Sequence, residues 1–452
     1  MSEKSREKLF RDPIHNVIQF NLADDVDRML FSLIDTEVVQ RLRYVRQLGL
    51  ANFVYHGAEH SRFGHSVGVQ HIAKRIFDSA NPKGDPFDRA VTRAAGLLHD
   101  VGHAAFSHAF ESGISQICHF DHESMTCAYI MDESGDVYRI LHDFDPKMPE
   151  RVFQCIAQEC HAWYHPIISS QLDADRMDYI LRDGYMTGIK NYLYDMDRIL
   201  EMLDHDDMGI IVGYRAIHAV ETYLISRYHM YQQVYHHKTV RGAEKLLEAV
   251  FMRVADLATA GDTSVFEVGR MGTLLRDCVA QRRVDPKLCM RVHDAHAWAA
   301  IDLWRDSGDR ILSDLSSHLL KRQFFKTVEI PDDFRGIIRT NWHVLEDVVQ
   351  KLGYSPKYYL SLDTTVNRAF APYSPESAPL LPFFETKASS GHANPDIRIE
   401  QPSGEVVSIQ DASPIVNMLT KIHSQVARLC FPSEVRPQIL EALKGMHIPV
   451  SG

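Results

Sequence analysis

The chain has 452 residues, of which 45% are hydrophobic and 24% are charged, and this composition excludes a disordered, collagenous or coiled-coil protein. Its formal net charge of −11 disfavours binding to nucleic acid or to an anionic membrane through overall charge. No segment has the roughly 20 consecutive apolar residues that span a bilayer, the start MSEKSREKLFRD is unlike a secretion signal, and seven cysteines without a CxxC pair favour a reducing cytoplasm.

Helical periodicity dominates the chain up to about residue 327. Apolar residues recur at helical spacing and predict helices over 71–77, 91–98, 175–182, 216–235, 241–258 and 311–325. The remainder predicts short strands over 328–338, 358–363 and 397–401, surface loops over 369–382 and 385–396, and a helix over 411–429 that begins at Ser413 and Pro414. We therefore expect a mainly α fold, with a helical body over 1–330, whose motifs lie within 41–241, and a mixed α+β region over 331–452 that could serve oligomerisation.

The most informative stretch is GLLHDVGHAAFSH, in which His99 and Asp100 directly follow a predicted helix. His65 lies upstream in RFGHSVGV, and Asp175 lies downstream in DADRMDYILRDG. Imidazole and carboxylate groups are suitable ligands for divalent ions. Because the helices of a bundle can bring distant ligands to one point, we expect these four side chains to form a metal site with two histidines and two carboxylates.

In this order, the motifs resemble those of the HD-domain metal phosphohydrolases, specifically the deoxynucleoside triphosphate triphosphohydrolases that include the animal SAM-and-HD-domain enzyme and its bacterial relatives. The resemblance covers about residues 9–330 and extends to FDHES and to YxxxYHHK at 231–238. We expect no SAM domain ahead of the motifs, as in the bacterial members. The resemblance implies an HD-domain helical bundle, hydrolysis of dNTPs to deoxynucleoside and inorganic triphosphate, and the metal ligands His65, His99, Asp100 and Asp175.

The resemblance also implies which residues handle protons. His108 stands at the position of the acid that protonates the leaving 5′-oxygen, with His103 as the alternative. His103 and His122 match histidines that contact the phosphates and the attacking water. Glu111 stands where the animal enzyme has aspartate, which preserves an orienting carboxylate. We expect Mg or Mn as the ion, with Fe, Zn, Co and Ni as alternatives.

Three arginines from separate segments are expected to neutralise the triphosphate. Arg62 matches the family's α-phosphate arginine, and Arg227 matches the arginine that reaches the terminal phosphate. Arg176 stands where the family has lysine, so the resemblance implies altered contact geometry there.

The sugar site resembles that of the family as well. Gln47 and Asp183 match the residues that hold the 3′-hydroxyl, and Tyr179 packs under the sugar. Leu48 and Tyr235 match the pair that leaves no room for a 2′-hydroxyl. Base preference is not implied, because the neighbouring Tyr231 stands where the animal enzyme has histidine.

A second set of residues resembles a site for an activating guanine nucleotide, GTP or dGTP, or another dNTP between subunits. Its members are Asp35, Gln40, Arg43, His237, Lys238, Arg322 and Lys326. Arg11 stands where the family has asparagine. The arginines of residues 41–46 also fit a solvated helix stripe, so an effector site and a solvated surface both stay open. An occupied effector site predicts a homo-oligomer, a tetramer or a dimer, that nucleotide activates.

Two other functions remain as alternatives. The first is an HD phosphohydrolase that acts on another phosphate ester, such as a nucleotide monophosphate or a cyclic dinucleotide. The residues expected to bind triphosphate and sugar disfavour this alternative. The second is a nucleic-acid-binding regulator that keeps a structural metal, and the negative net charge disfavours it. We expect a cytoplasmic enzyme without membrane contact and with at most weak binding to nucleic acid.

Overall fold

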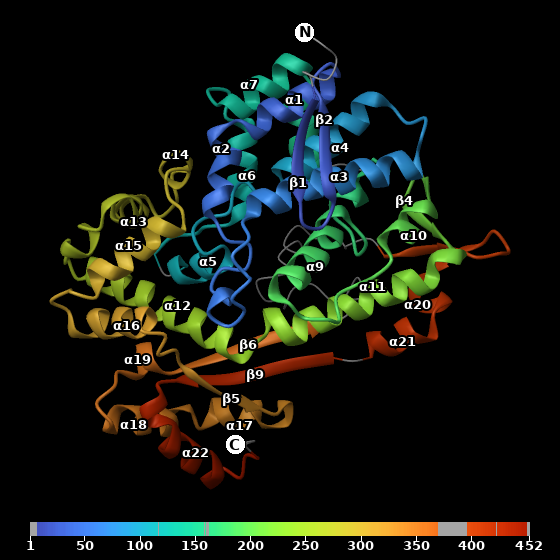
Figure 1. The fold of residues 1–452 in the computed structure, drawn as a ribbon. Coiled ribbons are helices and arrows are strands. Elements are labelled where there is room, and N and C mark those ends of the chain that lie inside the picture. Colours follow the sequence, from blue (N-terminus) through green and yellow to red (C-terminus); the bar gives the residue numbers. More distant parts are fainter. Residues whose placement is uncertain are drawn as a thin grey trace.

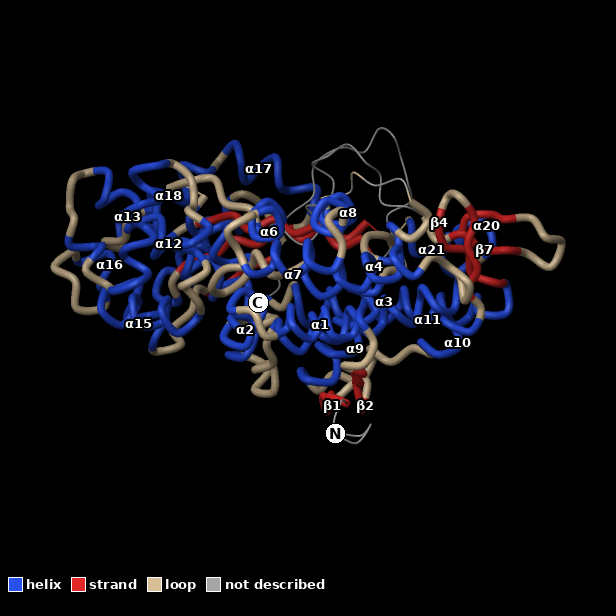
Figure 2. The backbone as a smooth tube through the Cα atoms, turned by 90° about the horizontal axis from the view of Figure 1, so that it is seen from above, coloured by secondary structure: helices blue, strands red, loops and turns tan. Residues whose placement is uncertain are grey.

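Helices carry most of the residues that the computed structural model describes, namely 7–115, 117–157, 159, 162–368, 396–421 and 423–449. Strands β1 to β9 form three small sheets among helices α1 to α22. In Figure 1, strands β6 and β9 run beneath the long helices α11 and α12. The view from above (Figure 2) shows an elongated molecule, with α13, α15 and α16 at one end and β4, β7 and α20 at the other. The predicted mainly α fold class is confirmed.

The N-terminal segment is an antiparallel hairpin of β1 (Glu7–Asp12) and β2 (Asn16–Asn21). Helix α1 (Asp25–Ile34) begins where the Asp24 carboxylate accepts the N–H of Asp27, as an N-cap does. Its apolar stripe, which includes Leu30 and Leu33, is buried. The chain continues through α2 (Glu37–Gln40) and the 3₁₀ helices η2 (Arg41–Tyr44) and η3 (Ala51–Phe53).

Three helices form the centre of the body: α3 (Arg62–Ala80) packs against both α4 (Pro86–Leu98) and α9 (Ala174–Thr187). Gly68 on α3 permits the close approach to α9, because a Cβ there would lie 2.0 Å from Oδ1 of Asp178. The helices predicted over 71–77, 91–98 and 175–182 lie within these elements and are confirmed.

Four shorter helices follow α4: α5 (His108–Ile114), α6 (His122–Met131), α7 (Asp136–Phe144) and α8 (Met148–Ile156). Helix α8 packs against α4, and α5 packs against the later helix α12. The loop after α4 touches the start of α6 at Gly102, where a Cβ would lie 2.0 Å from the carbonyl oxygen of His122. This contact places the loop that carries the His-Asp motif beside His122.

Next come α10 (Met196–Glu201), α11 (Ile217–Met230) and α12 (Lys238–Thr259). The helix predicted over 216–235 ends in a single π-helical turn, η6 (Tyr231–Tyr235), rather than in regular α-helix. The helices beyond are α13 (Gly269–Gln281), α14 (Pro286–Cys289), α15 (Asp294–Trp304) and α16 (Arg310–Leu320). The helix predicted to reach residue 325 ends at Leu320, and two residues on Arg322 takes a positive φ of 58° that breaks helical geometry.

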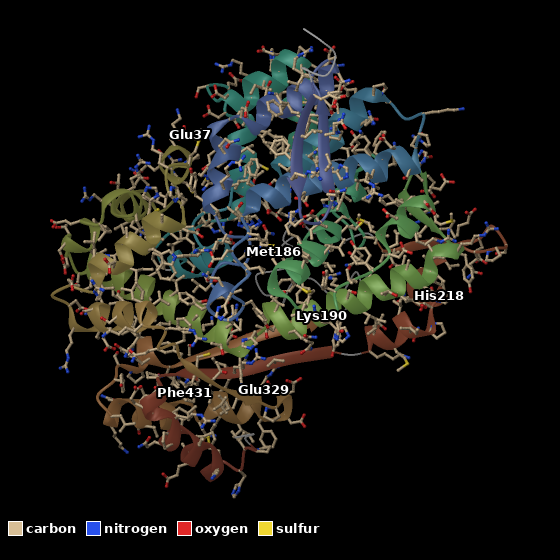
Figure 3. All side chains as sticks on the ribbon, in the orientation of Figure 1. Glu37, Met186, Lys190, His218, Glu329 and Phe431 are labelled. Atoms are coloured by element: carbon tan, nitrogen blue, oxygen red, sulfur yellow. The ribbon has the colours of Figure 1, made fainter. Side chains whose placement is uncertain are left out.

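The C-terminal region contributes the sheet β5-β9-β6, formed by β5 (Lys326–Ile330), β6 (Ser361–Arg368) and β9 (His423–Phe431). Figure 3 labels Glu329 and Phe431 on its adjacent strands β5 and β9. Around it lie α17 (Arg335–Thr340), α18 (Trp342–Lys351), α19 (Pro356–Tyr359) and α22 (Arg436–Gly445).

Several boundary predictions were wrong in this region. The strand predicted over 328–338 ends at Ile330, because Pro331 follows it and a helical turn begins at Asp332. Tyr358 and Tyr359 belong to α19 rather than to a strand. The helix predicted over 411–429 is correct only for α20 (Ile409–Ala412) and α21 (Pro414–Thr420), since β9 pairs with strands on both sides.

The second sheet joins distant parts of the chain in the order β3-β4-β7-β8. Its strands are β3 (Leu203–Asp206), β4 (Gly209–Gly213), β7 (Arg398–Glu400) and β8 (Val406–Ser408), and β7 confirms the strand predicted over 397–401. The predicted loop over 369–382 lies outside the described residues, and so does the predicted loop over 385–396 except for its last residue.

A search of the described helices finds none with the length and apolarity that crossing a membrane requires.

Candidate active site

Four side chains from three central helices meet at one point. His65 lies in the first turn of α3, His99 and Asp100 directly follow α4, and Asp175 lies in the first turn of α9. Nε2 of His65 lies 3.1 Å from Oδ1 of Asp175 and 3.7 Å from Oδ2 of Asp100. Nε2 of His99 lies 3.4 Å from Oδ1 of Asp100 and 3.6 Å from Oδ1 of Asp175. The structure therefore brings together all four side chains that the sequence suggested as metal ligands.

Both histidines turn the same nitrogen toward this point. Nδ1 of His65 is hydrogen-bonded to Oδ2 of Asp178 at 2.8 Å, and Nδ1 of His99 to the carbonyl oxygen of Gly96 at 2.9 Å. These acceptors require the proton on Nδ1, which leaves the lone pair on Nε2. Neither buried Nε2 atom has a hydrogen-bond partner. Two such lone pairs beside two carboxylates fit a divalent cation. The ligand atoms of His65, His99 and Asp100 lie within 4.8 Å of one another and could hold one, with Asp175 adjoining through Oδ1.

The electrostatics of the four groups favour the same conclusion. Burial raises the pKa values of Asp100 and Asp175, but neighbouring groups outweigh it and hold both pKa values well below the usual range. The chief neighbour is the Arg62 guanidinium for Asp100, and the contacts with His65 and His99 act on Asp175. Burial lowers the pKa of His65, yet Asp175 and Asp178 raise it to about 10. Ionised carboxylates that stabilise the protonated ring of His65 stabilise a metal cation for the same electrostatic reason, and a bound cation would take the place of the proton on Nε2.

Asp178 supports the metal ligands from behind, a role that the sequence reasoning missed. Besides His65 Nδ1, its carboxylate contacts Nε2 of His15 at 2.7 Å and accepts Nε and a terminal nitrogen of Arg182 at 2.7 and 2.9 Å. The side chain is fully buried. The signal that could have found it is its place one helical turn after Asp175 within DADRMDYILRDG.

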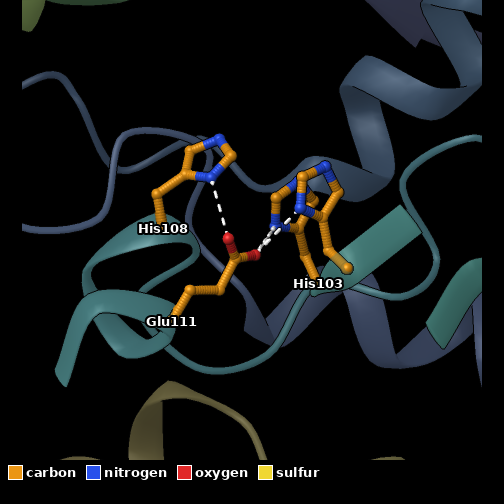
Figure 4. A group of neighbouring side chains, drawn as sticks. His103, His108 and Glu111 are labelled. Carbon is orange, nitrogen blue, oxygen red and sulfur yellow. Dashed lines mark hydrogen bonds and ion pairs between the residues drawn. The ribbon is translucent and has the colours of Figure 1, made fainter. Parts of the chain in front are cut away.

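A second cluster lies beside the metal ligands, and Figure 4 shows His103 and His108 turned toward the carboxylate of Glu111. Nδ1 of His122 bonds Oε1 of Glu111 at 2.9 Å, while Nδ1 of His108 lies 3.5 Å from Oε2 and Nδ1 of His103 lies 3.7 Å from Oε1. Nε2 of His103 also lies 3.4 Å from Oδ1 of Asp100. The four residues expected to handle protons therefore adjoin the metal ligands.

The second cluster suits proton transfer better than it suits a second metal ion. The rings of His103 and His122 stack with centroids 3.9 Å apart and planes 13° apart. Imidazole lone pairs lie in the ring plane, so those of two parallel rings do not converge on one ion. Burial disfavours the charged form of all three imidazoles. It lowers the pKa of His108 and lowers that of His103 further. At His122 the Glu111 carboxylate outweighs burial and raises the pKa. Of the three imidazoles, His122 is thus the one at which Glu111 most favours a proton.

The three arginines expected to bind phosphates are buried and already have protein partners. Arg62 pairs with Asp100 and donates from Nε to Oγ of Ser107 at 2.8 Å. Arg176 pairs with Asp173, while its Nε has no hydrogen-bond partner. Arg227 donates to Oε1 of Gln171 at 2.7 Å.

The predicted sugar residues gather around Asp183 on α9. Oδ2 of Asp183 accepts the hydroxyl of Tyr235 at 2.8 Å, and Oδ1 contacts Nε2 of His60 at 2.7 Å. His60, which sequence reasoning did not single out, also accepts the backbone N–H of Gln47 at 3.0 Å through its carbonyl. The ring of Tyr179 lies 6.0 Å from that of Tyr235. Leu48 is partly buried against the small cluster of Ala51, Ala58 and Val240, and the ring of Tyr231 lies 5.1 Å from that of Tyr235.

The residues expected to bind an effector fall into two groups. Near the start of the chain, Arg43 donates from Nε to Oε1 of Gln40 at 2.8 Å, and Asp35 is exposed at the end of α1. Elsewhere, Arg322 donates to the carbonyl oxygen of Phe53, and His237 caps α12. Lys238 and Lys326 are exposed at the starts of α12 and β5.

Comparisons with known proteins agree with the arrangement of the site. Residues 62–183 match the HD domain, and residues 194–274 match the HD associated region. The uncharacterized protein YwfO of Bacillus subtilis is 33% identical over 446 residues, which are 95% of this chain and 93% of that protein. A deoxynucleoside triphosphate triphosphohydrolase, the SAMHD1 homolog of Dictyostelium discoideum, is 31% identical over 269 residues, or 55% of this chain. That match spans only 50% of the Dictyostelium protein.

A solved structure resembles the whole fold. The crystal structure of a phosphohydrolase from Bacteroides thetaiotaomicron superposes with a TM-score of 0.73 at 25% sequence identity. The superposition covers 94% of this chain and 99% of that one. The likeness therefore includes the C-terminal region as well as the helical body.

Proposed function

The chain belongs to the HD-domain phosphohydrolases that carry an HD-associated region, and we propose that its substrates within this family are deoxynucleoside triphosphates. The products are a deoxynucleoside and inorganic triphosphate. The name of the Dictyostelium relative supports this choice, although the chain spans only 50% of that protein. The remaining support comes from the residues that surround the metal ligands.

The observation that carries the proposal is the face of α9. Asp175, Tyr179 and Asp183 follow one another at i, i+4 and i+8 on this helix, about 12 Å from first to last along its axis. A nucleotide laid along this face has its phosphates at the metal ligand Asp175, its sugar over Tyr179 and its 3′-hydroxyl at Asp183. The neighbouring Asp183 contacts, His60 and Tyr235, hold the carboxylate in place.

Charge supports a triphosphate over a monophosphate. A triphosphate carries about four negative charges, and buried cationic side chains can neutralise them in the absence of water. Arg176 lies next to Asp175 in sequence, is 7% exposed and offers an unpartnered Nε. Arg227 is 1% exposed, and its guanidinium lies 5.7 Å from the ring of Tyr231. Together with Arg62, they provide three cationic groups from three segments.

For the chemistry, we propose that His65, His99, Asp100 and Asp175 hold one divalent ion, Mg or Mn before Fe, Zn, Co or Ni. When bound, such an ion supplies Lewis-acid polarisation of the α-phosphate and lowers the pKa of water. Arg62, already paired with Asp100, then stabilises charge that develops on the phosphate oxygens. His108 donates the proton that the leaving 5′-oxygen needs, and Glu111 orients it through Nδ1.

The acid has one competitor, His122. Its bond to Glu111 raises its pKa, which favours the protonated ring. His103, whose pKa is low and whose Nε2 faces Asp100, suits contact with phosphate or with the attacking water instead. We keep His108 as the acid on the strength of its family position; Glu111 acts against burial to raise its pKa, and the negative charge of a bound triphosphate would raise it further, so that the ring can carry the proton it donates. His122 is then the group that contacts phosphate.

Selection against ribonucleotides follows from the sugar site. Leu48 and Tyr235 offer an apolar surface and a hydroxyl that Asp183 already engages. A 2′-hydroxyl placed between them would lose its water without a new partner, which costs binding energy. We propose that this pair excludes ribose.

Regulation and location complete the proposal. We propose that Asp35, Gln40 and Arg43 of one subunit, with His237, Lys238, Arg322 and Lys326 of neighbouring subunits, bind an activating nucleotide in a tetramer or dimer. The six described cysteines are free thiols, which supports a cytoplasmic location.

The decisive experiment incubates the purified protein with each dNTP and with Mn or Mg, and identifies the phosphate product. Inorganic triphosphate is expected from dNTPs and not from the matching ribonucleotides. Nucleotide monophosphates and a cyclic dinucleotide serve as controls for the alternative phosphohydrolase. Release of pyrophosphate or of single phosphates from dNTPs would refute the proposed bond cleavage.

A further inference from the structure

The loop between the metal ligands and His108 contains two consecutive residues in an unfavourable backbone conformation. Phe106 has φ 58° and Ser107 has φ 53° with ψ −126°, although neither is glycine. Residues with a Cβ avoid positive φ because the side chain collides with the backbone. Such conformations persist where surrounding contacts hold them, and they cluster at functional sites.

A single distant carboxylate holds this turn. Oδ1 of Asp294, the first residue of α15, accepts the backbone N–H of Phe106 at 2.9 Å. Its Oδ2 accepts the backbone N–H of Arg46 at 3.1 Å, and the residue is only 5% exposed. One turn later on α15, the ring of Trp298 packs edge-on against that of Phe106, with centroids 5.0 Å apart. Helix α15 thus fixes the turn by one hydrogen bond and a ring contact, and a second hydrogen bond ties Arg46 to the same carboxylate.

The turn in its constrained form connects three parts of the active site. Oγ of Ser107 accepts Nε of Arg62 at 2.8 Å and donates to the carbonyl oxygen of Arg46 at 3.0 Å. Arg62 in turn pairs with the metal ligand Asp100. The next residue, His108, begins α5, while Arg46 directly precedes Gln47 and Leu48.

We propose that Asp294 is a positioning residue that fixes the Phe106–Ser107 turn and thereby sets His108 and Arg62 against the metal ligands. A carboxylate suits this task because both of its oxygens accept a backbone N–H, whereas an amide of the same size directs an NH₂ group at one of them. The geometric part of the proposal stands on the contacts alone. Its catalytic part rests on the proposed function, in which His108 and Arg62 act on the substrate.

The test compares Asp294→Asn with Asp285→Asn in the full-length protein. Asp285 caps α14, and its carboxylate also accepts two backbone N–H groups, from Lys287 and Leu288, but away from the site. We expect Asp294→Asn to speed amide hydrogen exchange in peptides that contain Arg46 and Phe106. With dCTP or dGTP and Mn, kcat should fall about 10- to 100-fold at a nearly unchanged KM, and bound Mn should stay at the wild-type level. Asp285→Asn should change neither kcat nor exchange in those peptides.

A second variant keeps the proposal testable if Asp294→Asn does not fold. Ser107→Ala retains the backbone turn but removes the hydroxyl between Arg62 and Arg46, so kcat should fall without faster exchange at Arg46. Wild-type exchange rates at Phe106 and Arg46 in Asp294→Asn would overturn the positioning role. A wild-type protein that hydrolyses no dNTP, yet shows the exchange difference, would refute the proposed function and leave the Asp294 contacts established.

Discussion

Asp178 accepts the Nδ1 proton of His65 across a distance of 2.8 Å, at a fully buried position behind the metal ligands. This contact settles which nitrogen of His65 faces Asp100 and Asp175. It also joins the N-terminal hairpin to the site, since His15 and Arg182 share the same carboxylate and Arg182 reaches Asp12 at the end of β1 at 2.9 Å.

Replacing Asp178 should therefore weaken metal binding without removing a ligand. In Asp178→Asn the amide loses the negative charge that favours the Nδ1–H form of His65, and metal affinity should fall about 10- to 100-fold. Titration calorimetry with Mn measures the affinity directly. Asp197→Asn, at an exposed partner of Arg75, is the matched control and should bind Mn like the wild type. Equal affinities for all three proteins would contradict the supporting role.

Removing a ligand should have a larger effect than removing its support. Asp175→Ala deletes one of the two carboxylates and should abolish dNTP turnover and lower the bound metal measured by mass spectrometry. Its fold should persist, because Asp175 is 22% exposed at the side chain and is not the capping residue of α9, which is Asp173. A metal-replete, active Asp175→Ala protein would show that this fourth ligand is misassigned.

The roles of His108 and His122 can be distinguished with substrates whose leaving groups differ in their need for a proton. If His108 is the acid, His108→Gln should slow hydrolysis of a dNTP strongly, by about 10²- to 10⁴-fold, and much less for an analogue whose leaving group needs no proton. His122→Gln should slow both substrates alike, since it removes a positive charge near phosphate. The reverse pattern would make His122 the acid, in line with its raised pKa.

Ribonucleotide exclusion can be tested at Leu48. Leu48→Ala removes most of an apolar side chain beside Val240 and should admit the 2′-hydroxyl, so the ratio of kcat/KM for dGTP over GTP should fall about 10-fold or more. Val240→Ala, in the same small cluster but on α12, controls for loosened packing. An unchanged ratio in Leu48→Ala would remove this residue from the sugar site.

Stability should fall in mild acid because a buried histidine resists protonation. Burial of the His71 ring, with Arg75 and Lys74 among its neighbours, lowers its pKa from 6.5 to about 4. Between these two values the unfolded chain binds a proton that the folded protein does not, so the free energy of unfolding decreases as pH falls from 6.5 toward 4. The effect is absent above pH 6.5, where the ring is neutral in both states.

Urea unfolding at several pH values measures this dependence. His71→Gln should reduce the slope of unfolding free energy against pH in this window by up to about 1.4 kcal/mol per pH unit, the equivalent of one proton. His218→Gln, at a side chain that is 90% exposed, serves as the control. A slope in His71→Gln equal to that of the wild type would contradict the depressed pKa.

The central helices and the metal ligands could be predicted because their signals are local. The helix before His99 and the one after Asp175 follow from apolar spacing, and the order of the ligand motifs identifies the family. Asp178 and His60 are harder, because a buried carboxylate or imidazole looks like a surface residue until α3 and α9 are packed together. Asp294 could not be predicted from the sequence. Its partners Arg46 and Phe106 lie 248 and 188 residues earlier, and they bind it through backbone N–H groups, which leave no mark on the side-chain pattern.

The errors in the C-terminal region have a related cause. Residues 423–429 carry a mixture of apolar and polar side chains that fits helix or strand, and pairing with β5 and β6 decides for β9. At the π-helical turn Tyr231–Tyr235, the hydroxyl of Tyr55 donates to the carbonyl oxygen of Gln233, a contact that the local sequence does not reveal. Tertiary contacts overrode local preference in both segments.

The place of β9 between β5 and β6 also sets an order of events during synthesis. The two flanking strands do not pair with each other, so the ribosome must produce the chain through Phe431 before either gains its neighbour. Until then both expose unpaired edges that can recruit other chains. We expect nascent chains that stall before His423 to depend on chaperones, while the helices around His65 and Asp175 already have their local partners.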